Sequence, residues 1–452
     1  MENQIKFFCE INKNINFLKK KYQSISLLKK DILNIFPDIT IKNNIVLLKP
    51  NWVAHSINEK DKYCLTTHPN FVFAVLEILL DLSPRKVIIG DAPIQGGKWR
   101  RLVDDAFMAQ INIYEEKYNI PIDVKDFRKT LLDKHTNTVI RKTRSALNHV
   151  IFDLGNKSYL EPISTHRHLF RVTDYDPRRL SISHAPGVHK YCIAKEFFQV
   201  DEVFSLPKIK THQKTGITGA LKNLVGINCD KDFLPHHRVG GVGHGGDCYP
   251  GTSNLARLSE FFLDKANMNI GNYRYFTWKL LSKILWKLGM PAAGPNNLEA
   301  GWYGNDTTWR MVMDINLIAR YGTVDGNIHD EPQRKIYSIC DGIIAGQGNG
   351  PLHPEMLPLG AVCFSDNPAL ADACAAVLMG FDILKIPLVR EGLRLYNDGN
   401  ADFFSDQLKM TREKLRSLRL KAKPPAGWKG HIEFEKFENH DRDTSQREKF
   451  FR

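Results

Sequence analysis

Residues 205–229 constrain the fold of this chain more than any other segment. The apolar run Val203–Leu206 is typical of a buried strand, and a dense set of cations and hydroxyl groups follows it at once. A helical pattern then begins near Thr215 and carries Lys222 and Asn223. Where a strand leads through a charged loop into a helix, backbone N–H groups and the helix dipole point toward an anion. The segment therefore predicts an anion-binding site within an α/β fold.

A β-α-β unit is predicted nearer the beginning of the chain. Asn44–Leu48 and Arg85–Ile89 are short apolar runs, and Phe71–Leu80 between them carries apolar residues at helical spacing. Such a unit implies a right-handed crossover and a parallel sheet, which binds ligands beyond the carboxyl ends of its strands. We therefore expect a mostly parallel, Rossmann-like sheet flanked by helices. The polar residues that follow the two runs are expected on one rim of this sheet: Lys49, Asn51 and Asp91.

The remaining segments predict additions to this α/β domain. They are a helical N-terminal extension over 1–40, the α/β domain over 41–390, and a charged C-terminal tail over 391–452 with a helix at Lys409–Lys423. Within the domain we expect a β-rich insertion over 120–180, a Gly/His-rich loop over 229–250 and a helical insertion over 253–320.

The net charge of +13 and the pI near 9.2 favour an acidic partner, although a basic surface without function explains them equally well. A nucleic acid is not expected, because the chain shows no helix-turn-helix, zinc-finger or RNA-reading signature. The eight cysteines form no C-x-x-C pair, which excludes an iron–sulfur cluster with local ligands and a thioredoxin-like redox motif. The thiols are therefore interpreted as reduced.

The sequence predicts a cytoplasmic protein, since we find neither a signal-peptide pattern nor an apolar stretch of about 18 residues. Residues 276–289 form an amphipathic pattern with lysines at 279, 283 and 287. One interpretation is a helix that lies peripherally on the inner face of the membrane. The alternative, which we favour, is a surface helix that packs its apolar side on the core.

The histidines of the Gly/His-rich loop allow two interpretations. His236, His237 and His244 lie close to Asp247 and Cys248, and zinc accepts N, S and O ligands of this kind. The spacing matches no standard zinc motif, however, and the segment equally suits a mobile flap over a site. A divalent metal at these three histidines is thus one hypothesis.

Eight separated motifs resemble the domain-of-unknown-function family 362 (DUF362) in order, over about residues 44–390. They are Leu48–Asn51, Thr66–Pro69, Gly90–Pro93, Leu206–His212, Thr215–Gly226, Asp341–Gly342, Gly346–Pro351, and Asp366–Asp372 with Leu378–Gly380. Many relatives carry a ferredoxin-like cluster domain, whose motif this chain lacks. A shorter stretch, His212 to Lys222, is similar to a segment of the nickel-pincer lactate racemase family. That second resemblance implies a lysine-tethered nickel cofactor and hydride chemistry on a hydroxy acid.

The predicted function is that of an enzyme with a small anionic substrate, a carboxylate or a phosphate, at the sheet rim. His68 or His212 would transfer a proton, since imidazole titrates near neutral pH, and Asp91 or Asp341 would hold a cation or polarise the base. Substrate-binding residues are expected at Lys49, Asn51, Lys208, Lys210, Lys222, Asn223, Gly348 and Gly350. Two alternatives are a metal-dependent redox enzyme or isomerase and a non-catalytic protein that binds a lipid-linked or polyanionic intermediate at a membrane.

Overall fold

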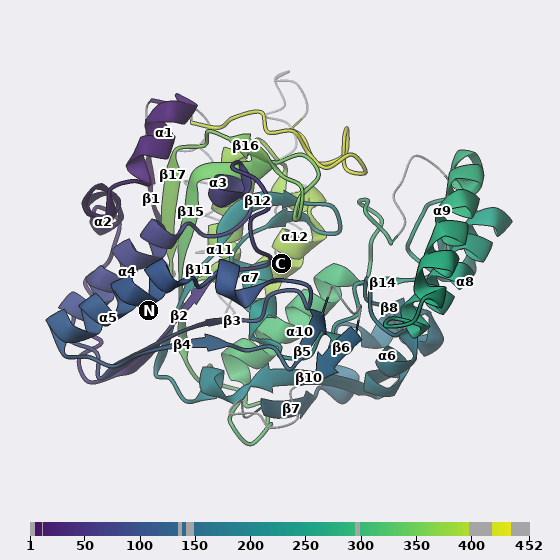
Figure 1. The fold of residues 1–452 in the computed structure, drawn as a ribbon, viewed down its shortest axis with the longest axis horizontal. Coiled ribbons are helices and arrows are strands. Elements are labelled where there is room, and N and C mark those ends of the chain that lie inside the picture. Colours follow the sequence, from purple (N-terminus) through teal and green to yellow (C-terminus); the bar gives the residue numbers. More distant parts are fainter. Residues whose placement is uncertain are drawn as a thin grey trace, which may run out of the picture.

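A sheet of ten strands runs through the centre of the protein (Figure 1). The computed structural model describes residues 5–10, 12–133, 138–141, 149–293, 299–396 and 418–434. The strands follow the order β1-β17-β15-β11-β2-β3-β4. β15, β11, β2, β3 and β4 are parallel, and β17 is antiparallel to both of its neighbours, β15 and β1. The predicted α/β fold with a mostly parallel sheet is therefore confirmed.

The main sheet contains β1 (Ile5–Cys9), β2 (Ile45–Pro50), β3 (Lys86–Asp91), β4 (Ile122–Asp126), β11 (Glu202–Leu206), β12 (Lys208–His212), β13 (Gly216–Thr218), β15 (Lys335–Gln347), β16 (Glu355–Leu357) and β17 (Ala361–Ser365). Smaller sheets contain β5 (Thr130–Asp133), β6 (Thr138–Arg141), β7 (His149–Asp153), β8 (Phe170–Arg171), β9 (His184–Ala185), β10 (Val188–Ala194) and β14 (His237–Arg238).

The helices are α1 (Ile15–Lys21), α2 (Ile25–Leu33), α3 (Asp61–Cys64), α4 (Pro69–Asp81), α5 (Asp105–Tyr118), α6 (Pro177–Ser183), α7 (Ala220–Asn223), α8 (Asn254–Met268), α9 (Arg274–Ala293), α10 (Thr308–Tyr321), α11 (Pro368–Leu378) and α12 (Pro387–Leu395). In Figure 1, α2, α4 and α5 lie on one side of the sheet, and α7, α10, α11 and α12 lie on the other.

Alternating side chains of the central strands supply two hydrophobic cores. Val46 and Leu48 of β2 face the core that contains α4, whereas Leu47 faces the core that contains α10 and α11. This two-residue period is what a strand covered on both faces requires. The segment Asp61–Asp81 is long and apolar enough to cross a membrane, but 72% of its apolar window is buried within the protein. We therefore assign it to the core.

Three predicted segments differ from the structure. The N-terminal extension is not only helical, because β1 adds an edge strand beside β17. The predicted β-rich insertion includes β4, which belongs to the main sheet as the neighbour of β3. Residues 418–434 are not a tail, because Trp428 and Ile432 are buried in the body of the protein. The predicted helix over Lys409–Lys423 lies outside the described residues up to position 417, and 418–423 is not helical.

The sequence was also misleading immediately after β11. The predicted charged loop is strand β12, which is buried throughout and pairs with the far half of β15. Residues 216–218 form strand β13 rather than the start of a helix, and α7 has only four residues. The lysines that we expected in a loop therefore belong to the interior of the sheet.

Candidate functional site: a lysine–histidine cluster at the sheet rim

The first buried ion pair joins the ends of β2 and β3. Lys49 Nζ lies 2.9 Å from Asp91 Oδ1 and 3.3 Å from Asn223 Oδ1. The second carboxylate oxygen of Asp91 accepts the Trp52 N–H at 2.7 Å. Burial lowers the pKa of Lys49, and the charge of Asp91 opposes this effect. Gly226 is required beside the pair, because a Cβ there would lie 1.8 Å from Asp91 Oδ1. The predicted residues Lys49, Asp91 and Asn223 are thus brought together, but the Lys49 ammonium group is already paired with the side chains of the other two.

A second buried pair joins β12 to β15. Lys208 Nζ lies 2.9 Å from Asp341 Oδ2 and donates to the Tyr22 hydroxyl at the same distance. Tyr22 in turn donates to Asp341 Oδ1, and the backbone N–H of His68 donates to Asp341 Oδ2 at 3.2 Å. The pKa of Tyr22 is raised by burial first and then by the charge of Asp341. Three of the predicted residues, His68, Lys208 and Asp341, therefore meet in one network.

The predicted general base His68 is held in place by this network. Its ring stacks on Tyr22 with 4.4 Å between the ring centroids, and its Nδ1 accepts the Asn70 N–H at the start of α4. Burial lowers the pKa of His68 to about 3, with a further contribution from the charge of Lys208. At neutral pH the ring is therefore uncharged. Its Nδ1 serves as a helix cap, which is a structural use of a nitrogen that we expected to transfer protons.

Beyond the two pairs lie further cations that have no carboxylate oxygen within 4.0 Å among the described residues. We call Lys210, His212, Lys214, Lys222, Lys231 and His236 the lysine–histidine cluster, because the charge of each of these lysines lowers the pKa of at least one other member. Lys210 Nζ donates to Asn51 Oδ1 at 3.4 Å and to the backbone oxygen of Leu65. Lys214 Nζ contacts Thr173 Oγ1 and His237 Nδ1. Within the described part of the chain, none of the four lysines forms an ion pair.

Burial is the main cause of the lowered pKa values in the cluster, and charges of both signs act after it. The charge of Glu299 opposes the lowering of the Lys214 pKa, and that of Asp91 opposes the lowering of the Lys231 pKa. The pKa of Lys222 is lowered to about 7, by burial first and then by the neighbouring lysine charges. Burial also lowers the pKa of Lys210 to about 7 and that of Lys231 to about 8. The pKa of His212 lies well below its usual value, through burial and then the charge of Lys222. The cluster thus combines lysines that titrate near neutrality with uncharged imidazoles.

The cluster is accessible to solvent at some of its members. Lys214, Lys222 and His236 each keep part of their surface exposed, whereas Lys210 is fully buried. Residues 418–434 border this region, since the Trp428 indole N–H donates to the Gln213 backbone oxygen at 2.6 Å. Lys222 is therefore more accessible to solvent than Lys210.

The predicted helix N-terminus is not open to a ligand. The N–H groups of Ala220 and Leu221, at the start of α7, donate to the carboxylate of Asp372. A Cβ at Gly219 would lie 2.0 Å from Asp372 Oδ1, so glycine is needed for this approach. Burial raises the pKa of Asp372 to about 7. The anion at this helix end is therefore a side chain of the protein itself.

The predicted glycine loop serves the fold in a similar way. Gly348 N donates to the Lys423 oxygen and Gly350 N donates to the Gly348 oxygen. A Cβ at Gly350 would lie 2.0 Å from the backbone oxygen of Thr211, so this glycine lets the loop approach β12. Both backbone N–H groups have partners within the protein, and neither is available to a substrate.

The predicted metal triad is not assembled. Among the described residues, no group of three His, Cys, Asp or Glu side chains is placed to hold a metal ion. His244 is exposed, whereas His237 is buried against Lys214 and His236 Nδ1 contacts the Leu234 oxygen at 2.7 Å. The hypothesis of a metal at His236, His237 and His244 is corrected accordingly, because the described side chains form no group of ligands there and His237 Nδ1 contacts Lys214 Nζ at 3.2 Å.

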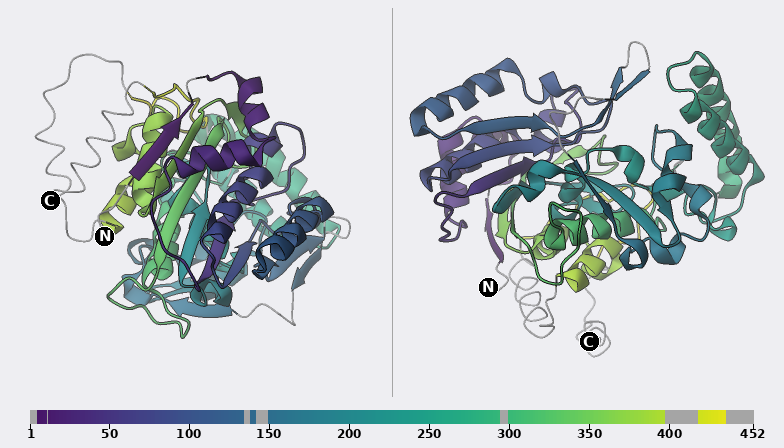
Figure 2. Two further views of the ribbon diagram at one scale, coloured as in Figure 1. Left: turned by 90° about the vertical axis from the view of Figure 1, so that its left-hand side faces the viewer. Right: turned by 90° about the horizontal axis from the view of Figure 1, so that it is seen from below.

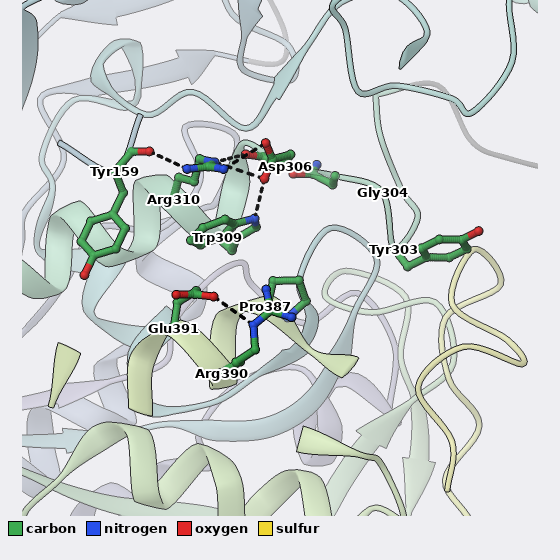
Figure 3. A pocket seen from close by; sticks show the side chains of 10 residues that line it. Tyr159, Tyr303, Gly304, Asp306, Trp309, Arg310, Pro387, Arg390 and Glu391 are labelled. Carbon is green, nitrogen blue, oxygen red and sulfur yellow. Dashed lines mark hydrogen bonds and ion pairs between the residues drawn. The ribbon is translucent and has the colours of Figure 1, made fainter. Parts of the chain in front are cut away.

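A surface cavity of about 490 Å³ lies next to the histidine-bearing loop (Figure 3). Asn305, which lines it, donates to the His236 backbone oxygen at 3.0 Å. Its charged groups are paired: Arg310 with Asp306 at 3.1 Å, and Arg390 with Glu391 at 2.9 Å. None of the predicted rim residues lines this cavity. The cavity therefore lacks the unneutralised charge that distinguishes the cluster.

Comparison with known proteins identifies the family. The sequence profile described as "Domain of unknown function (DUF362)" matches residues 46–147 and 153–377. The chain belongs to the DUF362 family. A search of curated proteins finds no match. A crystal structure of a Thermotoga maritima protein is similar at 7% identity with a TM-score of 0.34, covering 86% of this chain and 59% of that one. A likeness this low carries no argument about function.

Two residues of the candidate site in this DUF362 chain were not predicted from the sequence. Lys231 was not predicted, although it lies beside the Gly/His-rich loop that was singled out. Tyr22 gave no signal at all, because a tyrosine in a helical extension is ordinary and its partner Asp341 lies 319 positions away. Lys231 stands between Asp230 and Asp232 in the sequence, which is typical of a solvated loop, so no local signal distinguished it.

Lys222→Met is expected to raise the free energy of unfolding of this DUF362 chain by about 0.5–2 kcal/mol, because it removes a repelled charge and keeps the apolar stem. The folded-state pKa of about 7 lies below the ordinary lysine pKa of 10.5, so the stability of the wild-type protein increases as pH rises between these values. The advantage of the variant should therefore be larger at pH 6 than at pH 9. Urea denaturation at both pH values measures it, and a destabilised variant at pH 6 would show that Lys222 is structurally paired.

Proposed function

We propose that this protein is an enzyme that binds a small anionic substrate, a carboxylate or a phosphate, at the lysine–histidine cluster. The observation that carries the proposal is a contrast between two sets of lysines. Lys49 and Lys208 each have a buried carboxylate partner, whereas Lys210, Lys214, Lys222 and Lys231 have none within the described residues. An anionic ligand would supply the missing negative charge.

Burying lysines without a carboxylate partner costs free energy. Buried lysines are ordinarily paired, because an unpaired charge in a low-dielectric environment is expensive. Lys210 and Lys231 are buried lysines of this kind, and together with Lys214 they repel the charge of the partly exposed Lys222. Groups whose pKa values are displaced by burial and neighbouring charges concentrate at functional sites. The cluster thus fits a site whose stabilising partner arrives from solution.

We assign the roles of individual residues accordingly. Lys222 and Lys210 bind the anion as point charges, and Asn51, which contacts Lys210, orients it. His212 is the candidate general base, and Nε2 is the nitrogen that would accept the proton, because Nδ1 accepts the Lys214 N–H at 3.0 Å. Asp91 and Asp341 act as positioning residues through Lys49 and Lys208. The reaction class that fits these roles is proton abstraction or transfer on a bound carboxylate or phosphate.

Isothermal titration calorimetry with inorganic phosphate, pyrophosphate and a series of small carboxylic acids tests the proposal. We expect wild-type protein to bind at least one probe, and Lys222→Met to bind it at least about tenfold more weakly, since a charge-assisted contact contributes about 1.5–3 kcal/mol. Lys117→Met, which removes an exposed charge on α5, is the matched control and should bind as wild type does. Equal binding by wild type and Lys222→Met, or no binding of any probe, would contradict the proposal.

A further inference from the structure

Helices α8 and α9 form a hairpin that projects at one end of the molecule (Figures 1 and 2). The two helices pack closely on each other: Ser259 Oγ donates to the Ser282 oxygen at 2.7 Å, and Phe262 stacks on Trp278 with 5.4 Å between ring centroids. At Gly289 a Cβ would lie 2.7 Å from the Ala256 nitrogen. The inner faces of both helices are therefore occupied by the hairpin itself.

The outer face of the hairpin is apolar. On α9, four side chains spaced four residues apart are 50–65% exposed: Phe276, Leu280, Ile284 and Leu288. On α8, three more are 42–51% exposed: Leu255, Leu258 and Phe261. Residues four apart on a helix lie on the same face, so the α9 set forms a continuous stripe. An exposed apolar surface of this extent marks an interaction site.

The charges of the hairpin have one sign on its outer surface. Its acidic residues up to Gly289 are Glu260, which is buried and accepts the Gly240 N–H, and Asp264, which pairs with Arg171 at 2.7 Å. Both are therefore used within the protein. The cations Arg257, Lys283 and Lys287 are exposed and have no partner among the described residues. The apolar stripe thus lies among positive charges.

We propose that the outer face of the α8–α9 hairpin docks on a membrane surface that contains anionic lipids. Apolar side chains insert at the boundary of headgroups and acyl chains, while lysines and arginines contact the lipid phosphates. A second copy of this chain is a poor occupant, because a two-fold contact would place two positively charged faces against each other. An anionic surface accepts the apolar stripe and the cations together, and this complementarity favours it. The inference is independent of the proposed anion site.

Vesicle co-sedimentation tests the inference. We expect the protein to bind vesicles of phosphatidylcholine with about 30% phosphatidylglycerol, and to bind pure phosphatidylcholine at least about tenfold more weakly. Leu280→Glu/Ile284→Glu should lose binding by a similar factor. The matched control is Ile57→Glu/Ile182→Glu, which alters two apolar side chains of 76% and 75% exposure elsewhere and should bind as wild type does. All four substituted side chains are exposed, and circular dichroism verifies that both variants fold.

Two further measurements separate the alternatives. Lys283→Glu/Lys287→Glu should abolish the preference for anionic vesicles, because it reverses the charges beside the stripe. Sedimentation velocity should show no dimer that depends on Leu280 and Ile284. A dimer dissociated by Leu280→Glu/Ile284→Glu, or vesicle binding equal in this variant and in wild type, would overturn the inference.

Discussion

Lys208→Met is expected to lower the free energy of unfolding by about 3–5 kcal/mol, which is the usual cost of leaving one member of a buried ion pair without its partner. Lys208 and Asp341 are both fully buried, and their closest atoms are 2.9 Å apart. Methionine retains the apolar stem of lysine. The loss of stability therefore results from the removed charge rather than from a change in side-chain volume. Tyr22 and the His68 N–H remain to contact the carboxylate, but both are dipoles and cannot neutralise it.

Urea denaturation at pH 7 measures this loss. The double variant Lys208→Met/Asp341→Leu should recover part of the stability, because no unpaired charge is then buried. Lys222→Met is the opposite control, since it is expected to stabilise. If Lys208→Met unfolded at the same urea concentration as wild type, the Lys208–Asp341 pair would not be a determinant of the fold.

Anion affinity is expected to fall about 50-fold between pH 7 and pH 9 for each lysine that must be protonated in the complex. The free pKa values of Lys210 and Lys222 are about 7, so both are half protonated at pH 7 and about 1% protonated at pH 9. A bound anion raises these pKa values, since it favours the charged form. Binding near pH 7 therefore takes up protons, and affinity decreases as pH rises above 7.

Calorimetry in buffers that differ in ionisation enthalpy measures this proton uptake directly. The groups that face Lys222 are Lys210, Lys214 and Lys231, with His212 and His236 uncharged throughout this range. Lys231, with a pKa of about 8, extends the decrease toward pH 9. Lys222→Met should take up fewer protons than wild type. Affinity that is constant from pH 7 to pH 9 would mean that these lysines do not contact the anion.

The sequence predicted the central sheet well, because apolar runs bounded by polar residues are local signals. Asn44–Leu48, Arg85–Ile89 and Val203–Leu206 correspond to β2, β3 and β11, and Phe71–Leu80 lies within α4. The motifs of the candidate site also lie at the ends of these strands, as expected. Such signals are local, and a pattern of a few residues is enough to produce them.

The sequence did not predict which lysines are neutralised. Lys208 and Lys222 look alike in the sequence, yet one has a carboxylate partner from a strand 133 positions away and the other has none. The sequence predicted a loop at β12 for the same reason. Lysines disfavour a buried strand unless an aspartate from a distant part of the sequence neutralises their charge. Pairing of this kind depends on tertiary contacts, which spacing and composition do not encode.

Residues near both ends of the described chain hydrogen-bond to the segment from Lys208 to Gln213. Lys208 donates to the Tyr22 hydroxyl, and the Trp428 indole N–H donates to the Gln213 backbone oxygen. During synthesis the first of these contacts can form early, whereas the second waits until position 428 has emerged from the ribosome. A nascent chain that ends before Trp428 leaves the Gln213 carbonyl without this partner. The surroundings of the cluster are therefore completed only after the segment that contains Trp428 has been synthesised.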